Sequence, residues 1–170
     1  ITGSHNPPAW NGFKLSLGTG SLHGEDIIAL RRCIEAADFV NGAGRAEPAD
    51  ILPAYHQAVL ERLRNGRPLK VVVDAGNGMG GLTGPAVYRA LGHEVIELFC
   101  EPDGDFPNHH PDPTVEANLA HLKAAVLEHG ADLGLAFDGD ADRLGAVDSQ
   151  GRVIWGDQLL LFFAQAILAE

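Results

Sequence analysis

The sequence predicts an α/β fold in which a mixed or parallel β-sheet is sandwiched between helices. Short runs rich in Val and Leu, such as Leu69–Val73, alternate with segments whose apolar residues recur every three or four positions. Glycine-rich stretches separate the two kinds of segment, most densely over Asp74–Gly84. This alternation is typical of a doubly wound domain, which we expect over residues 50–155.

The first fifty residues predict a loop, one short strand and one helix. The opening TGSHNPPAWNG is rich in Gly, Pro and Asn, so we expect a loop there. Phe13–Leu17 alternates apolar and polar residues, which predicts a half-buried strand. Apolar residues then recur at helical spacing from Gly24 onward, which predicts an amphipathic helix. Asn41–Asp50 contains glycines, a proline and several charges, and is expected to be a linker.

The remaining elements follow the alternation of strand and helix. A second helix is expected through Tyr55, Val59 and Leu63, ending near Asn65. The elements expected after it are strands at 69–73, 93–99 and 132–137, helices at 85–91 and 115–130, and a β-hairpin at 144–147 and 153–155. The last segment, 157–170, is apolar nearly all round, which predicts a buried helix.

Composition and charge narrow the class of function. The 170 residues are 45% hydrophobic and 21% charged, which is typical of a globular protein and not of a disordered one. The net charge of −11 argues against a nucleic-acid partner, and no apolar run approaches the roughly 18 residues that a membrane span needs. Cys33 and Cys100 cannot form a disulfide framework. We expect both to be small buried hydrophobes in a cytoplasmic protein.

The strongest chemical signal is the acidic loop, Asp138-Gly139-Asp140-Ala141-Asp142-Arg143, which directly follows an expected buried strand. Small spacers let the three carboxylates converge, and two such charges about 4 Å apart repel by about 4 kcal/mol at an effective dielectric of 20. A cation would relieve this repulsion, and oxygen ligands favour Mg²⁺ or Ca²⁺. The alternative is a solvated acidic turn that leads into the hairpin. An EF-hand is excluded because Arg143 stands where that loop requires glycine.

Other motifs are less specific when taken singly. Ser4 lies in a loop and is accessible to modification, yet alone it indicates an ordinary turn serine, and Lys14 alone is a surface lysine. Gly76–Gly81 fits the G-x-G-x-x-G dinucleotide motif. A tight strand-to-helix turn is the favoured alternative, because Asp74 would place negative charge beside a pyrophosphate. His109 is expected to be a loop hydrogen-bonder, since no spacing indicates a zinc site.

Taken together and in this order, TGSHNP, NGFK, VVVDAGNGMGG, FPNHHPDP and DGDADR resemble the α-D-phosphohexomutases, in their bacterial phosphomannomutase/phosphoglucomutase branch. The resemblance covers essentially the whole chain and implies part of a four-domain fold. Residues 1–45 would be the end of domain one, 46–155 domain two, and 156–170 the start of domain three. The family's G-E-x-S-G-H sugar-reading loop does not occur here, so mannose and glucose phosphates are not distinguished.

The resemblance also implies a reaction and the residues that carry it. Ser4 would be a phosphoserine that donates its phosphate to a hexose monophosphate and takes the other phosphate back from the bisphosphorylated sugar. The Mg²⁺ ligands that it implies are Ser4, Asp138, Asp140 and Asp142. The catalytic residues that it implies are Ser4, His5, Lys14 and Arg143, the last three for general acid/base work and charge stabilisation.

Three alternatives remain open at this point. Asp138 follows a strand and could itself be the nucleophile of an aspartyl phosphatase or mutase. The GNGMGG segment could serve a non-catalytic nucleotide-binding module. The chain could also be a catalytically inactive remnant that only binds partners.

Overall fold

A computed structural model describes residues 2–63 and 66–169. They form two compact units, the first built mainly from Gly12–Asp50 and the second from Gly3–Asn11 together with the chain from Ile51 onward. Gly3–Asn11, here called the serine loop, therefore belongs to the same unit as the acidic loop. Among the described residues, no helix is both long and apolar enough to cross a membrane.

The first unit contains one small hairpin and one helix. Strands β1 (Ser16–Leu17) and β2 (Gly20–Ser21) pair antiparallel, and α1 spans Glu25–Glu35. The strand expected over Phe13–Leu17 is shorter and more exposed than predicted, because its ladder has a single two-residue partner. The helix is confirmed, although its apolar residues remain exposed.

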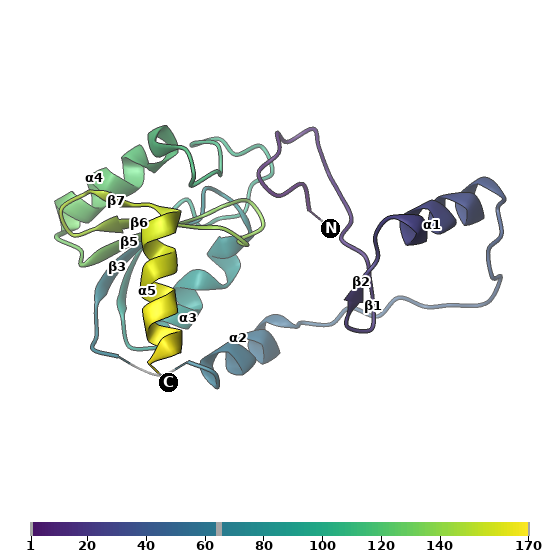
Figure 1. Ribbon diagram of the computed structural model, residues 1–170, viewed down its shortest axis with the longest axis horizontal. Coiled ribbons are helices and arrows are strands. Elements are labelled where there is room, and N and C mark those ends of the chain that lie inside the picture. The colour runs from purple at the N-terminus through teal and green to yellow at the C-terminus, as the bar shows by residue number, and fades with distance from the viewer. Residues whose placement is uncertain (1, 64–65, 170) are drawn as a thin grey trace. The chain divides into compact units, whose positions relative to one another are not determined.

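The second unit is built on a five-stranded mixed sheet in the order β4-β3-β5-β6-β7. Figure 1 labels β3, β5, β6 and β7 of this sheet. Its strands are β3 (Lys70–Asp74), β4 (Glu94–Leu98), β5 (Leu133–Phe137), β6 (Leu144–Asp148) and β7 (Val153–Ile154). β3 pairs parallel with both β4 and β5, whereas β5, β6 and β7 pair antiparallel. The predicted mixed α/β fold and the hairpin are thus confirmed. The carboxyl ends of β3 and β5 lie side by side, with Asp74 opposite Ala136.

Helices cover both faces of this sheet, as alternate residues of β3 show. Val72 packs with Leu122 and Val126 of α4 (Ala120–His129) on one face. Val71 and Val73 belong to a second cluster, which includes side chains from α3 (Gly84–Ala90) and α5 (Gly156–Leu168). The other helical segments are α2 (Leu52–Leu60) and the 3-10 turns η1 (Met79–Leu82) and η2 (Glu116–Leu119). α2 ends before Leu63, and its predicted end at Asn65 lies outside the described residues.

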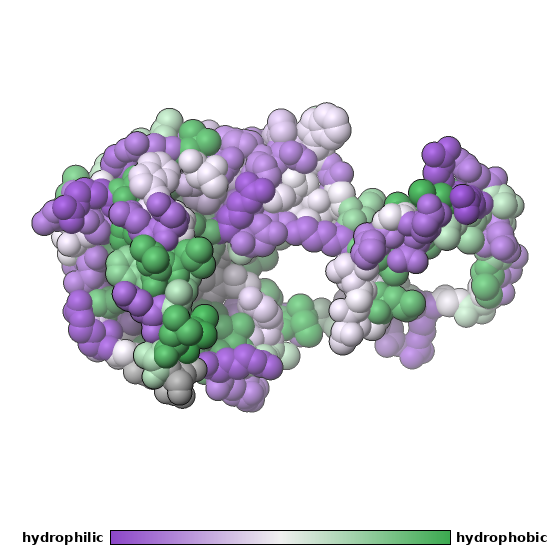
Figure 2. Space-filling model, viewed as in Figure 1, coloured by the Kyte–Doolittle hydropathy of each residue, from purple (hydrophilic) through white to green (hydrophobic). Residues whose placement is uncertain are grey.

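Two further predictions about burial are wrong. α5 was expected to be buried, but it contains no buried residue, and Leu160 and Leu161 are each 66% exposed. Only the side of α5 that carries Leu159 packs on the sheet. The apolar side chains on its other side are therefore exposed, and Figure 2 shows them as a hydrophobic area over this helix. Cys33 is exposed on α1, whereas Cys100 is half-buried. Burial, and next the charge of Glu97, raise the pKa of the Cys100 thiol to about 11, so that it stays protonated.

Gly81 is required where η1 passes the chain after β4. A Cβ at this position would lie well under 3.0 Å from the carbonyl oxygen of Cys100, which is backbone and cannot move aside alone. We expect Gly81→Ala to destabilise the chain by about 2–3 kcal/mol through overpacking. Urea unfolding measures this, with Gly104→Ala as the control because its Cβ would meet nothing within 4 Å. Equal unfolding midpoints for the two variants would contradict this account.

Candidate functional site

The serine loop presents Ser4 to the acidic loop from 134 residues away in sequence. Ser4 Oγ donates a hydrogen bond to Asp138 Oδ2 at 3.0 Å. His5 Nδ1 lies 3.2 Å from the same Oγ and can donate to it when that nitrogen carries a proton. Ser4 has a positive φ of 53°, and the amide of Asn6 donates to the carbonyl of Gly3, so the chain turns tightly at the hydroxyl. The hydroxyl is thus held between a carboxylate and an imidazole.

The acidic loop closes on the carboxylate of Asp138, which is fully buried at the end of β5. Asp138 Oδ1 accepts the backbone N–H of Arg143 at 3.1 Å, and the carbonyl of Asp138 accepts the N–H of Ala141 at 3.0 Å. Ala141 has a φ of 61°, so the chain reverses here. With Oδ2 bonded to Ser4, both oxygens of Asp138 are engaged. The loop geometry is therefore set by its own first carboxylate.

Three carboxylates converge in this loop, as the sequence predicts. Asp138, Asp140 and Asp142 each offer one oxygen, and these atoms lie within 4.8 Å of one another. At an effective dielectric of 20, two charges 4 Å apart repel by about 4 kcal/mol, so a divalent cation would stabilise the cluster. Because all the donors are carboxylate oxygens, with a serine oxygen beside them, they suit a hard cation such as Mg²⁺. The residues present therefore fit a metal ion.

Glycines allow the loops to approach one another this closely. A Cβ on Gly139 would collide with the carbonyl oxygen of Ser4, so the backbones of the two loops are in direct contact. On its other side, Gly139 packs against Gly78 of the glycine turn (Gly76–Gly81), and its carbonyl accepts the N–H of Met79 at 3.0 Å. Since the glycines serve close packing against the neighbouring loops, the structure supports the tight-turn interpretation of GNGMGG over the dinucleotide one.

Asp112 is a charged neighbour of the site that the sequence analysis did not single out. Partial burial opposes its ionisation, but hydrogen bonds from Thr114 and the charges of His5 and Arg143 hold the pKa of Asp112 below its usual range. The carboxylate is therefore negative and lies close enough to His5 and Arg143 to interact with both electrostatically. The only sequence signal was its place in the motif FPNHHPDP, whose approach to His5 depends on tertiary structure.

The predicted site residues are distributed over both units. Ser4, His5, Asp138, Asp140, Asp142 and Arg143 all belong to the second unit. Arg143 is exposed, and its backbone amide closes the acidic loop. Lys14 is exposed in the first unit, so its role beside Ser4 stays a prediction. His109 is confirmed as a loop hydrogen-bonder, since its ring bonds Asp74 and the carbonyl of His110.

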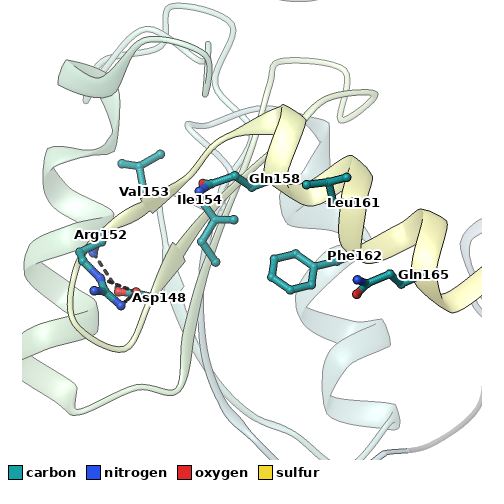
Figure 3. A pocket seen from close by; sticks show the side chains of 8 residues that line it. All are labelled: Asp148, Arg152, Val153, Ile154, Gln158, Leu161, Phe162 and Gln165. Carbon is teal, nitrogen blue, oxygen red and sulfur yellow. Dashed lines mark hydrogen bonds and ion pairs between the residues drawn. The ribbon is translucent and has the colours of Figure 1, made fainter.

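Several hollows lie in the described part of the second unit, and two of them border the acidic loop, one at Asp140 and Ala141 and a smaller one at Gly139. A hollow of about 490 Å³ is bordered by Asp140 and Ala141 and is otherwise lined mostly by apolar residues of α2 and α3. A larger one of about 650 Å³ lies between the β6–β7 hairpin and α5 (Figure 3). This hollow is lined by the Asp148–Arg152 ion pair and by side chains of α5. None of its lining residues is a predicted site residue.

Comparisons with known proteins agree on one family. Residues 53–151 match the model of the phosphoglucomutase/phosphomannomutase α/β/α domain II. A phosphomannomutase/phosphoglucomutase from Pseudomonas aeruginosa is 49% identical over 100% of this chain and 37% of its own length. A phosphoglucomutase from Neisseria gonorrhoeae is 49% identical over 99% of this chain and 37% of its own.

A solved structure gives the same result. The crystal structure of a phosphoglucomutase/phosphomannomutase family protein from Burkholderia thailandensis superposes with a TM-score of 0.91 at 44% identity. The match covers 99% of this chain and 37% of that one. The chain thus spans about 37% of the length of the relatives that it matches.

Proposed function

Because the chain belongs to the phosphoglucomutase/phosphomannomutase family, we propose that it carries the phosphoserine and metal loop of a Mg²⁺-dependent phosphohexomutase. The complete enzyme would interconvert hexose 1-phosphate and hexose 6-phosphate of glucose or mannose through a hexose 1,6-bisphosphate. One observation carries the proposal, namely the 3.0 Å hydrogen bond that joins Ser4 Oγ to Asp138 across 134 residues. In this proposal, residues 1–45, 46–155 and 156–170 belong to three successive domains.

The chain's own residues would divide the work of phosphoryl transfer. In the phosphorylated protein the P–O bond to Ser4 Oγ breaks and a P–O bond to the sugar hydroxyl forms. That hydroxyl gives up its proton to a base, and the freed Ser4 Oγ takes up a proton from an acid. His5, Lys14 and Arg143 are our candidates for the proton transfer and for charge stabilisation. Asp138, Asp140 and Asp142 with Ser4 would hold Mg²⁺, which neutralises charge on the phosphoryl group when bound. The second half of the reaction returns the other phosphate of the sugar to Ser4.

The aspartyl-nucleophile alternative is less well supported. Both oxygens of Asp138 accept hydrogen bonds, and its side chain is fully buried, so it is poorly placed to attack phosphorus. Incubation with a hexose 1,6-bisphosphate followed by peptide mass spectrometry tests this directly. We expect one phosphate ester on Ser4 that resists hydroxylamine. A hydroxylamine-labile acyl phosphate on Asp138 would replace our proposal with the alternative.

Asp140→Asn is expected to weaken Mg²⁺ binding by about tenfold or more, since the neutral amide keeps an oxygen but removes one negative charge from the cluster. Isothermal titration of Mg²⁺ into the chain, with Ser4 phosphorylated and unphosphorylated, measures the change. Asp157→Asn is the matched control, because Asp157 is an exposed acid in the first turn of α5, outside the acidic cluster. If Asp140→Asn and the control bind Mg²⁺ equally, the metal assignment is wrong.

The proposed setting is the reducing cytoplasm. Cys33 and Cys100 are both free thiols. The proposed partners are hexose phosphates, and the excess of 23 acidic over 12 basic residues gives no support to a nucleic-acid partner.

A further inference from the structure

A buried ion pair outside the proposed catalytic set joins the end of β3 to the loop after β4. Asp74 is fully buried, and His109 Nε2 lies 3.0 Å from each of its two carboxylate oxygens. Asp74 Oδ1 also accepts the N–H of Gly76 at 2.9 Å. The side chain of His109 is only 11% exposed. The pair therefore lies in the interior, where electrostatic attraction is strong and each partner needs the other.

The geometry indicates that His109 is an imidazolium. Its second ring nitrogen, Nδ1, lies 3.0 Å from the carbonyl oxygen of His110. Both ring nitrogens thus face oxygens that can only accept, so each must carry a proton to form its hydrogen bond. The hydrogen bond to Asp74 raises the pKa of His109 above its usual range, and this exceeds the opposing effect of burial. A neutral ring would leave one nitrogen lone pair facing an oxygen.

This pair supports the glycine turn, which in turn contacts the acidic loop. Through the amide of Gly76, Asp74 fixes the start of the turn, and Gly76 has a left-handed φ of 52°. The Cβ of the fully buried Pro111 and Cε1 of His109 would both lie within 3.2 Å of a Cβ on Gly76, so the two segments are in close contact. Two residues further on, Gly78 packs on Gly139, and Met79 donates to the carbonyl of Gly139. Gly139 is the residue on which the backbone of Ser4 rests.

We propose that Asp74 and His109 form a positioning pair, which holds the glycine turn against Gly139 and so sets the separation of the acidic loop from Ser4. This inference rests on the proposed metal site. Neither residue touches the reacting atoms, so the pair acts through the backbone of the turn. Its effect is expected on the affinity for Mg²⁺ and on the pH dependence of that affinity.

The expected pH dependence has a definite sign. Because the pKa of His109 is raised by folding, the contribution of the pair to stability is full below the ordinary histidine pKa of about 6.5. It is lost as the pH rises through the higher pKa of the folded state. The ionisable side chains that face the ring are Asp74 and His121, whose ring is stacked on that of His109 at 6.2 Å. Loss of the proton should therefore loosen the turn and lower Mg²⁺ affinity at alkaline pH.

Two variants, His109→Gln and His109→Asn, test whether a hydrogen-bond donor at the position of Nε2 is needed opposite Asp74. The Gln side chain can place its N–H₂ near the position of Nε2 and keep a donor toward Asp74, whereas the Asn side chain mimics Nδ1 and loses that donor. We expect His109→Asn to weaken Mg²⁺ binding by about tenfold and His109→Gln to recover most of this loss. The alkaline decline in affinity should be present in the wild-type chain and absent in both variants. Circular dichroism confirms that each variant is folded at the temperature of the titration.

NMR titration of the His109 ring in the wild-type chain keeps the test decisive if a variant fails to fold. We expect the ring to stay protonated above pH 6.5, the ordinary pKa of histidine. A ring that titrates at or below that pH, or a folded His109→Asn variant with wild-type Mg²⁺ affinity, overturns the positioning pair. Asp140→Asn separates this outcome from failure of the proposed function. If Asp140→Asn binds Mg²⁺ as the wild type does, the assignment of the metal site is wrong. The NMR titration then still shows whether His109 is protonated beside Asp74.

Discussion

Ser4→Ala is expected to abolish phosphohexomutase turnover in the complete enzyme, by about four orders of magnitude or more, as for loss of other covalent nucleophiles. Ser4 is the only residue with a hydroxyl side chain in the serine loop, so no other hydroxyl within Gly3–Asn11 can carry the phosphate ester in its place. Alanine keeps the Cβ at this position of positive φ, so the substitution leaves the backbone strain unchanged. The lost hydrogen bond to the buried carboxylate of Asp138 costs about 1.5–3 kcal/mol of stability, which is less than the roughly 5–15 kcal/mol by which a folded domain is typically stable.

Steady-state turnover of glucose 1-phosphate and mannose 1-phosphate measures the effect, with phosphate incorporation by mass spectrometry as the second readout. Ser149→Ala is the control, because Ser149 is an exposed serine of the turn between β6 and β7. We expect the control to keep both turnover and phosphate. Wild-type turnover in Ser4→Ala would remove the phosphoserine from the mechanism. Loss of turnover with phosphate now found on Asp138 would favour the aspartyl alternative.

Local sequence patterns predict the central part of the sheet well. The Val-rich run at 69–73 has no polar interruption except Lys70, and Val71–Val73 are all buried in the observed strand. The expected end of α4 at Gly130 is confirmed, with a left-handed φ of 58° that suits glycine. Such features depend on a few neighbouring residues, so they can be predicted from a short segment.

Burial at the margins of the unit was harder to predict. The composition of residues 157–170 indicates a buried helix, but burial depends on what packs around α5, which its own sequence does not contain. The same reason explains the short hairpin at Ser16–Ser21, where the alternating pattern has only one strand to pair with. Apolar periodicity therefore predicts the type of an element more reliably than its environment.

The candidate site contains some residues that a short segment of sequence predicts and others whose contacts depend on tertiary structure. The acidic loop was predicted from six consecutive residues, and its carboxylates do converge. The contact of Ser4 with Asp138 was expected only from a family resemblance, because nothing local links positions 134 residues apart. The Asp74–His109 pair was missed because its two members are 35 residues apart and join adjacent loops through tertiary structure. A carboxylate at the end of a buried strand was the one signal that could have suggested a buried partner.

Gly139→Ala is expected to lower turnover of the complete enzyme by about two orders of magnitude while the protein stays folded, since a misplacement of about 1 Å at a reacting group can cost this much. The new Cβ would lie well under 3.0 Å from the carbonyl oxygen of Ser4, and backbone on that side cannot rotate away as a side chain would. The φ of Gly139 is not in the left-handed region, so alanine itself fits the local backbone. The strain must therefore separate the serine loop from the acidic loop.

Gly104→Ala is the matched control, another loop glycine of the same unit whose Cβ would meet nothing within 4 Å. We expect Gly139→Ala to bind Mg²⁺ more weakly after phosphorylation of Ser4 than the control does, because the phosphate no longer reaches the carboxylates. In the unphosphorylated chain the two variants should differ less, since Asp138, Asp140 and Asp142 remain together within the acidic loop. Wild-type turnover in Gly139→Ala would show that the close approach of Ser4 to this loop is not needed for catalysis. That result would separate the phosphoserine from the metal site and contradict the contact on which the proposed function rests.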